Sequence, residues 1–192
     1  LNDGYVEDNE TLILKMVSVS NSAVVITDTG TLTIVDDDVA SVTIADVSVS
    51  ESSSSANVIL VLDKYFSPGS FTVRVLTTDG TAKSPGDYTA VSETVTFSGY
   101  TGENKTVSIP LRVGDTTIEG DETITVSMDS ASYGVLDVSD NATVTIEDDD
   151  FATLTIADKT VNEGDNTTLT LSLSEGLKSS FTVVVSTVDS SA

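Results

Sequence analysis

The sequence predicts an all-β protein that consists of tandem seven-stranded immunoglobulin-like β-sandwiches. The 192 residues are rich in Val, Thr and Ser, include three prolines, and contain hardly any blocks of helix-forming Ala, Leu, Glu and Lys. Short segments alternate between apolar and polar residues, as strands with one buried face do. A long internal repeat indicates how these strands are grouped into domains.

The repeat is visible in two features of the chain. The strand-like segment 39–46 recurs as 151–158, and the three aspartates at 36–38 recur at 148–150, each displaced by 112 positions. This displacement predicts three domain segments: the C-terminal part of one repeat at 1–38, a complete repeat at 39–150, and the N-terminal part of the next repeat at 151–192.

The connection between successive repeats is expected to be short. Asp38 is followed directly by the first strand of the next repeat, and no segment rich in Gly, Ser or Pro separates the two. Without a flexible linker, neighbouring repeats should abut closely. We therefore expect a stiff rod of domains.

Alternating residues within the complete repeat mark seven strands, separated by turns that contain Gly, Pro and Asp. The expected strands are 41–49, 57–62, 71–77, 93–97, 106–113, 123–128 and 142–147. Seven strands in about 110 residues fit a two-sheet sandwich. The residues expected in its core are Val42, Ile44, Val73, Val75, Ile109, Leu111, Ile124, Val126, Val144 and Ile146.

Composition excludes several classes of function. The chain has 31 acidic and 8 basic residues, a net charge of −23, so it lacks the basic surface that nucleic acids require. It contains no Cys, His or Trp, which excludes thiolate and imidazole catalysis and zinc sites built on Cys or His. No apolar run is long enough to cross a membrane. We expect a protein that is not an enzyme, that does not insert directly into membranes and that binds cations.

The acidic residues of the complete repeat concentrate at strand ends and in the adjoining loops. Carboxylates that crowd together repel by about 4 kcal/mol per pair at about 4 Å in an effective dielectric of about 20. A calcium ion, which takes six to eight oxygen ligands in flexible geometry, would offset this repulsion. The crowded residues are Glu51, Asp87, Asp115, Glu119, Glu122, Asp148, Asp149 and Asp150.

Acidic runs are also common on solvated surfaces, which leaves ordinary solvation as an alternative to metal binding. The recurrence at 112 positions favours the metal, because solubility does not require acidic residues to recur at fixed places. The partial repeats carry counterparts of the crowded residues at Glu7, Glu10, Asp36, Asp37, Asp38 and Glu163.

An ordered series of motifs resembles the Calx-β family. The motifs are Asp79-Gly80-Thr81-Ala82, then Gly86-Asp87-Tyr88, then Glu119-Gly120-Asp121-Glu122-Thr123, and finally the strand at 142–147 with the aspartates that follow it. The resemblance implies a sandwich that binds calcium at one pole through the eight residues named above for the complete repeat. It also implies a backbone carbonyl ligand at Thr117. Gly114 and Thr116 stand where the strongest binders of the family have further aspartates, which implies fewer ions or weaker binding.

We therefore expect a calcium-binding structural repeat of a long extracellular adhesin or surface filament, in which calcium makes the array rigid. Its expected partners are calcium ions, the neighbouring repeats, and a protein or glycan at a cell surface. The alternatives are a calcium-sensing regulatory domain of a membrane protein and an accessory domain of a secreted enzyme. Aromatic residues in or beside the loops either anchor a partner or, more commonly, pack over the rim of the sandwich; these are Tyr65, Phe66, Tyr88 and Tyr100.

Overall fold

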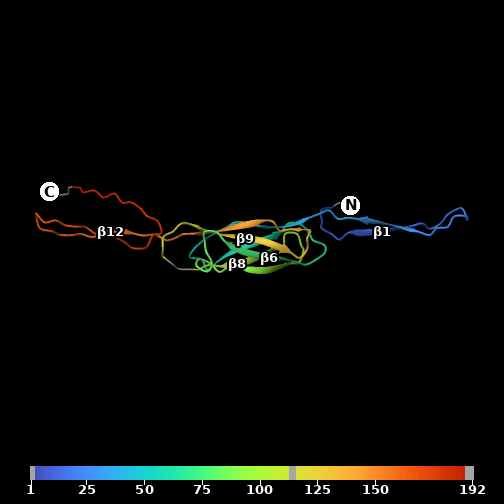
Figure 1. The fold of residues 1–192 in the computed structure, drawn as a ribbon, viewed down its shortest axis with the longest axis horizontal. Coiled ribbons are helices and arrows are strands. Elements are labelled where there is room, and N and C mark those ends of the chain that lie inside the picture. The colour runs from blue at the N-terminus through green and yellow to red at the C-terminus, as the bar shows by residue number, and fades with distance from the viewer. Residues whose placement is uncertain (1–2, 113–115, 189–192) are drawn as a thin grey trace.

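The computed structural model describes residues 3–112 and 116–188. These residues form an elongated, all-β molecule with a sandwich in the middle and a hairpin at each end of the long axis (Figure 1). No helix capable of spanning a membrane occurs within the two described ranges. The all-β prediction is confirmed.

The segment 39–150, predicted to be a complete repeat, forms two packed sheets. One sheet has four strands in the order β10-β3-β5-β8, and the other has five strands in the order β4-β11-β9-β6-β7. The strands are β3 (Ala40–Ile44), β4 (Val47–Ser50), β5 (Ser55–Leu62), β6 (Phe71–Asp79), β7 (Ser92–Phe97), β8 (Asn104–Pro110), β9 (Glu122–Ala131), β10 (Leu136–Asp137) and β11 (Asn141–Glu147).

The predicted strand at 41–49 is divided into two strands that belong to different sheets. β3 pairs antiparallel with β5, whereas β4 pairs parallel with β11. Two aspartates satisfy backbone groups where the chain crosses over: Asp140 Oδ2 accepts the Ile44 N–H at 3.0 Å, and Asp46 Oδ1 accepts the Thr143 N–H at 2.7 Å. One segment thus contributes a strand to each sheet, which alternation in sequence does not reveal.

The core lies between the two sheets. All ten residues expected in the core are buried, because the apolar positions of each strand face the opposite sheet. Aromatic rings extend the core toward the N-terminal pole: Phe71 stacks on Phe97 with centroids 5.1 Å apart, and Phe66 meets Phe71 edge to face at 5.2 Å. The C-terminal pole, at the other end of the sandwich, carries the acidic loops.

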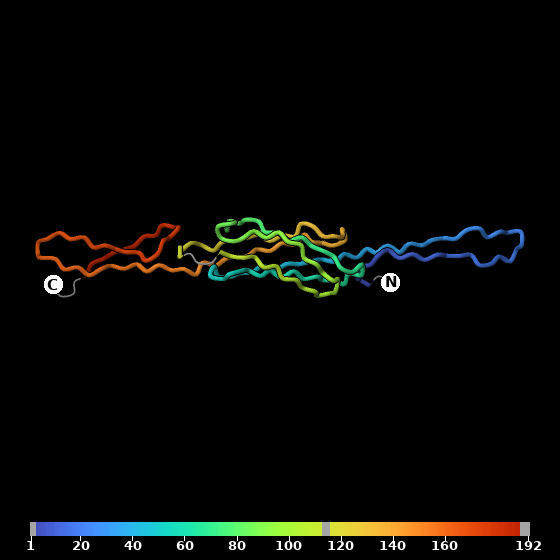
Figure 2. The backbone as a smooth tube through the Cα atoms, turned by 90° about the horizontal axis from the view of Figure 1, so that it is seen from below, coloured from blue at the N-terminus to red at the C-terminus, as the bar shows by residue number. Residues whose placement is uncertain are grey.

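The end segments form separate antiparallel pairs that point in opposite directions (Figure 2). β1 (Glu10–Lys15) pairs with β2 (Thr29–Ile34), and β12 (Leu154–Ile156) pairs with β13 (Leu171–Leu173). Their registers match those of the complete repeat: Glu10 lies opposite Ile34 as Glu122 lies opposite Ile146, and Leu154 lies opposite Leu173 as Val42 lies opposite Leu62. The side chains of these four paired strands are exposed.

Candidate metal centre

Strand pairing brings the acidic residues of the C-terminal pole together. β4 and β11 run parallel, and Ser50 lies opposite Glu147 at their last paired position. The next residue, Glu51, donates its backbone N–H to the Glu147 carbonyl at 3.0 Å. The loop after β4 therefore begins beside the three aspartates that follow β11, although nearly 100 residues separate the two segments in sequence.

Glu51, Asp148 and Asp150 form a compact group. One carboxylate oxygen from each lies within 4.8 Å of the other two, and all three residues are half-buried. Asp148 and Asp150 turn to the same side of the chain because successive residues of an extended segment alternate. The Asp148 Oδ1 and Asp150 Oδ2 atoms are buried and have no hydrogen-bond partner among the residues that the structure describes.

The loop before β9 holds Asp148 in place. Asp148 Oδ2 accepts the Glu119 backbone N–H at 3.2 Å, and the Asp148 N–H donates to Asp121 Oδ1 at 3.3 Å. The Glu119 side chain is 10% exposed and forms an ion pair with Lys178, which lies in the following segment. The pole is thus built from three stretches of the complete repeat and is contacted by the next stretch of chain.

The residues of this group fit a hard divalent cation. At about 4.8 Å, like charges repel by about 3 kcal/mol per pair in an effective dielectric of about 20, and burial of unpaired carboxylate oxygens adds a desolvation cost. Calcium binds carboxylate and carbonyl oxygens in flexible geometry, whereas magnesium demands near-ideal octahedral geometry and retains several waters. The group supplies oxygen ligands only, so it suits calcium.

Asp149 faces away from the group. Its Oδ2 accepts a hydrogen bond from Ser50 Oγ, and the hydroxyls of Ser50 and then Ser52 lower the pKa of Asp149 below its ordinary value of 3.8. Of the three consecutive aspartates, the middle one therefore has different hydrogen-bond partners from the two on either side of it.

The remaining described residues predicted for the site occupy different places in the fold. Asp87 belongs to the loop before β7, where its Oδ2 accepts the Lys83 N–H at 2.6 Å and its carbonyl accepts the Arg112 N–H at 2.8 Å. Glu122 begins β9 opposite Ile146, two residues before Asp148. Half-buried Thr117 lies in the loop that leads to Glu119, and Asp115 falls outside the described residues.

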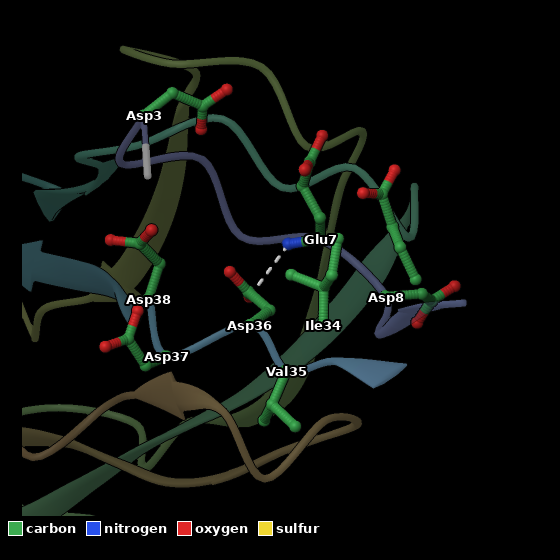
Figure 3. Close-up of a pocket in the computed structure, with 9 residues that line it drawn as sticks. Asp3, Glu7, Asp8, Ile34, Val35, Asp36, Asp37 and Asp38 are labelled. Carbon is green, nitrogen blue, oxygen red and sulfur yellow. Dashed lines mark hydrogen bonds between the residues drawn. The ribbon is translucent and has the colours of Figure 1, made fainter. Parts of the chain in front are cut away.

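The N-terminal segment carries a second acidic pocket, shown in Figure 3. Asp36 Oδ2 accepts the Glu7 N–H at 3.0 Å, and the Asp36 N–H donates to Asn9 Oδ1 at 3.0 Å, which are the same two contacts that Asp148 makes 112 positions later. The pocket has a volume of about 140 Å³ and is lined by Asp3, Glu7, Asp8, Glu10, Ile34, Val35, Asp36, Asp37 and Asp38. In the C-terminal segment, Glu163 is exposed.

Several residues at these two sites were not selected from the sequence. Asp121 and its counterpart Asn9 hold the aspartate runs in place. Asp3 lines the N-terminal pocket and precedes Glu7 by four positions, the spacing that also separates Asp115 from Glu119. The 112-residue displacement could have identified all three, because it matches Asp121 to Asn9 and Asp115 to Asp3.

The Calx-beta domain family model matches residues 35–150. The solved structure titled apo-form Calx CBD1 domain is similar with a TM-score of 0.53 and 26% identity, covering 59% of this chain and 100% of that chain. The solved calcium binding domain CBD12 of CALX1.1 is 27% identical, with a TM-score of 0.49, covering 56% of this chain and 44% of that one. A comparison with curated protein sequences finds no significant match.

The family match coincides with the architectural unit. It spans more than half of the chain, contains both sheets of the sandwich and ends at Asp150, the last member of the acidic group. The similarity to the solved Calx CBD1 domain also covers the full length of that domain. The chain therefore belongs to the Calx-β domain family.

Proposed function

We propose that this protein is a non-catalytic structural module that binds calcium at the pole formed by Glu51, Asp148 and Asp150. Calcium there stiffens a series of repeats in a long extracellular adhesin or surface filament. The observation that carries the proposal is the pair of buried carboxylate oxygens, on Asp148 and Asp150, that have no partner among the described residues and lie beside a third carboxylate. Family membership supports the choice of calcium.

The contacts between repeats support a mechanical role. Val6, from the N-terminal segment, is 1% exposed and packs in the core of the complete repeat. Its N–H donates to the Tyr65 carbonyl at 3.2 Å, and its carbonyl accepts the Ser67 N–H at 2.8 Å. The next residue along the chain, Glu7, lines the acidic pocket. An ion in that pocket would therefore fix a loop that is already anchored in the following repeat.

The second junction has the same construction. The Ile118 N–H donates to the Gly176 carbonyl at 3.0 Å, and the Ile118 carbonyl accepts the Lys178 N–H at 3.0 Å. Ile118 directly precedes Glu119, as Val6 precedes Glu7. In both junctions a lysine of the following segment pairs with an acidic residue of the preceding pole: Lys64 with Asp38 at 3.4 Å, and Lys178 with Glu119.

An extracellular location agrees with the composition. The chain has no Cys, many Ser and Thr residues and a net charge of −23. Extracellular calcium modules work with dissociation constants of about 0.1 to 1 mM, which suits a small group of carboxylates.

The Lys178–Glu119 pair favours one alternative, a calcium-sensing regulatory domain. Calcium would compete with the ammonium group for Glu119, and this competition would change the angle between neighbouring domains. The two functions differ in what calcium does to the junction: a structural module keeps the same angle and narrows its range, whereas a sensor moves to a different angle.

Thermal unfolding of the full chain in millimolar calcium chloride and in chelator tests the calcium site. A ligand that binds only the folded protein raises the melting temperature, so we expect a rise with calcium and a smaller rise with magnesium. The double variant Glu51→Gln/Asp150→Asn should remove the part of the rise that comes from the C-terminal pole, so that only the part from the N-terminal acidic pocket remains. Glu93→Gln, which removes a carboxylate from an exposed position of β7, serves as the control and should leave the rise intact. If calcium does not raise the melting temperature of the wild-type chain, the proposed calcium site is wrong and the sandwich is an acidic spacer without a bound ion.

A further inference from the structure

Three exposed tyrosines meet at the junction between the N-terminal segment and the complete repeat. Tyr5, Tyr65 and Tyr100 are 50%, 37% and 65% exposed and line a shallow pocket together with Thr101. Exposed single aromatic residues are ordinary, but three that share one pocket form a contiguous aromatic surface. Neither the calcium site nor the core of the sandwich uses this surface.

The rings stand at steep angles to one another. Tyr5 and Tyr65 have centroids 5.7 Å apart and planes at 84°, and Tyr65 and Tyr100 have centroids 6.3 Å apart and planes at 44°. A flat sugar ring stacks best on a flat aromatic platform, which rings at these angles do not provide. Rings that face different directions present their electron-rich faces to a compact group, which is the arrangement that attracts cations.

The electrostatic surroundings favour a positive ligand. Asp3 Oδ1 accepts the Tyr5 N–H at 3.1 Å, and Asp3 also lines the acidic pocket, so that the two pockets adjoin. The net charge of −23 adds a field that attracts cations and repels anions. A metal ion prefers the carboxylates of the acidic pocket, whereas an alkylated ammonium, which is weakly hydrated and partly apolar, gains more from the rings.

Both sides of the junction contribute to the tyrosine pocket. Tyr5 belongs to the N-terminal segment, and Tyr65 and Tyr100 belong to the complete repeat. At the second junction the corresponding backbone positions are Thr117 and Gly176, which have no aromatic ring. The aromatic pocket is therefore a specific feature of the first junction, and the general construction of the junctions does not require it.

We propose that the pocket of Tyr5, Tyr65 and Tyr100 binds an alkylated ammonium cation, such as the trimethylammonium group of a choline-bearing ligand. The rings contact the methyl groups and the positive charge, and the neighbouring carboxylates contribute a long-range attraction. This binding is separate from calcium binding at the poles. It would give the module a ligand-recognition function in addition to its structural one.

The test uses the full chain, choline chloride and nuclear magnetic resonance in millimolar calcium chloride, so that calcium competes for the acidic pocket. We expect the N-methyl protons to shift upfield, because they lie over aromatic rings, and the tyrosine ring signals to titrate with choline. The uncharged tert-butyl analogue of choline, which has the same shape, should bind at least about fivefold more weakly. Equal binding of the two probes would overturn the assignment of a cation site.

Variants localise the binding. Tyr65→Leu and Tyr100→Leu keep apolar bulk at exposed positions and should each weaken choline binding by about fivefold or more. Tyr133→Leu is the matched control, because Tyr133 is 41% exposed and contacts Phe66 but does not line the pocket. Choline binding that survives both pocket variants would overturn the proposal and would indicate only a diffuse attraction to the acidic surface. Loss of calcium binding would leave the choline result unchanged, which separates the two proposals.

Discussion

Neighbouring aspartates at the C-terminal pole have different environments. Asp148 and Asp150 face Glu51 with buried oxygens, whereas Asp149 is exposed and bonded to Ser50. The alternation of an extended chain produces this division, and it allows one acidic residue to serve as a control for its neighbour.

Asp150→Asn should raise the melting temperature of the full chain in chelator by about 2 to 8 °C, because it removes one charge from a repulsive group. In calcium, the same change should remove most of the stabilisation by the metal. Asp149→Asn should do neither, since its carboxylate faces the serine hydroxyls. Calorimetry of the two variants with and without calcium measures both effects, and equal responses would contradict the separate roles of the two residues.

The hydrogen bond between Asp79 and Tyr88 makes the stability of the protein depend on pH. The buried Tyr88 hydroxyl donates to Asp79 Oδ1 at 2.7 Å, and this bond, followed by the Ser84 N–H, lowers the pKa of Asp79 below 3.8. A carboxyl group whose pKa is lower in the folded state adds stability above its unfolded pKa. This contribution is lost as the pH falls through the folded pKa.

Tyr88→Phe should therefore destabilise the protein at neutral pH, and the difference from wild type should shrink below about pH 3.8. Urea unfolding of both proteins across this range measures the difference. A difference that stays constant with pH would mean that the hydroxyl acts through packing alone. Burial also raises the pKa of Tyr88, so its ionisation does not contribute at neutral pH.

At the scale of elements, the turn between β7 and β8 depends on a glycine whose backbone conformation and close contacts leave no room for a side chain. Gly99 has φ +93°, and a Cβ there would lie 2.7 Å from the Phe66 carbonyl oxygen and 2.9 Å from that of Gly69. The Gly99 carbonyl accepts the Phe66 N–H at 2.9 Å, which joins this turn to the loop before β6. Close backbone approach and a left-handed conformation coincide at this position.

Gly99→Ala should cost roughly 2 kcal/mol or more of unfolding free energy, because strain and close contact add together. Gly102→Ala is the control: Gly102 has φ +75°, and a Cβ there meets no atom within 4 Å. Its substitution should cost about 1 kcal/mol, from backbone strain alone. Chemical denaturation compares the two, and equal costs would show that the contact with the loop before β6 is unimportant.

At the scale of the whole molecule, the acidic poles lie beside the junctions between neighbouring segments. Each junction links a residue beside the acidic pole to the backbone of the following segment through two hydrogen bonds. The molecule is correspondingly extended, with the three segments in line (Figure 2). Short hydrogen-bonded connections of this kind restrict bending more than a flexible linker does.

Calcium should narrow the distribution of distances between spin labels placed at Ser139 in the sandwich and at Thr167 in the C-terminal segment. Both residues are exposed, and the absence of native Cys makes labelling at introduced cysteines specific. Pulsed electron–electron double resonance with calcium and with chelator gives the two distance distributions. A narrower distribution with the same mean supports the structural module, whereas a displaced mean supports the sensor. The Glu51→Gln/Asp150→Asn variant should show no response to calcium.

The sequence by itself determined the fold class, the core and the acidic composition of the pole. Alternation identifies buried positions such as Val42 and Val144, because the two-residue period of a strand is a local property of the chain. The 112-residue displacement likewise identified the acidic clusters on both sides of the complete repeat, since counterparts occupy the same places in each copy.

Tertiary structure decided which acidic residues meet and how the three segments of the chain touch. Glu51 reaches Asp148 only because β4 crosses to the second sheet and pairs with β11, and the sequence pattern treated β3 and β4 as one strand. The burial of Val6 in the core of the sandwich and the meeting of Tyr5 with Tyr65 also depend on contacts between distant segments. Local periodicity carries information about the side of a strand that a residue occupies, but the partner across a sheet or a junction is set by how the whole chain packs.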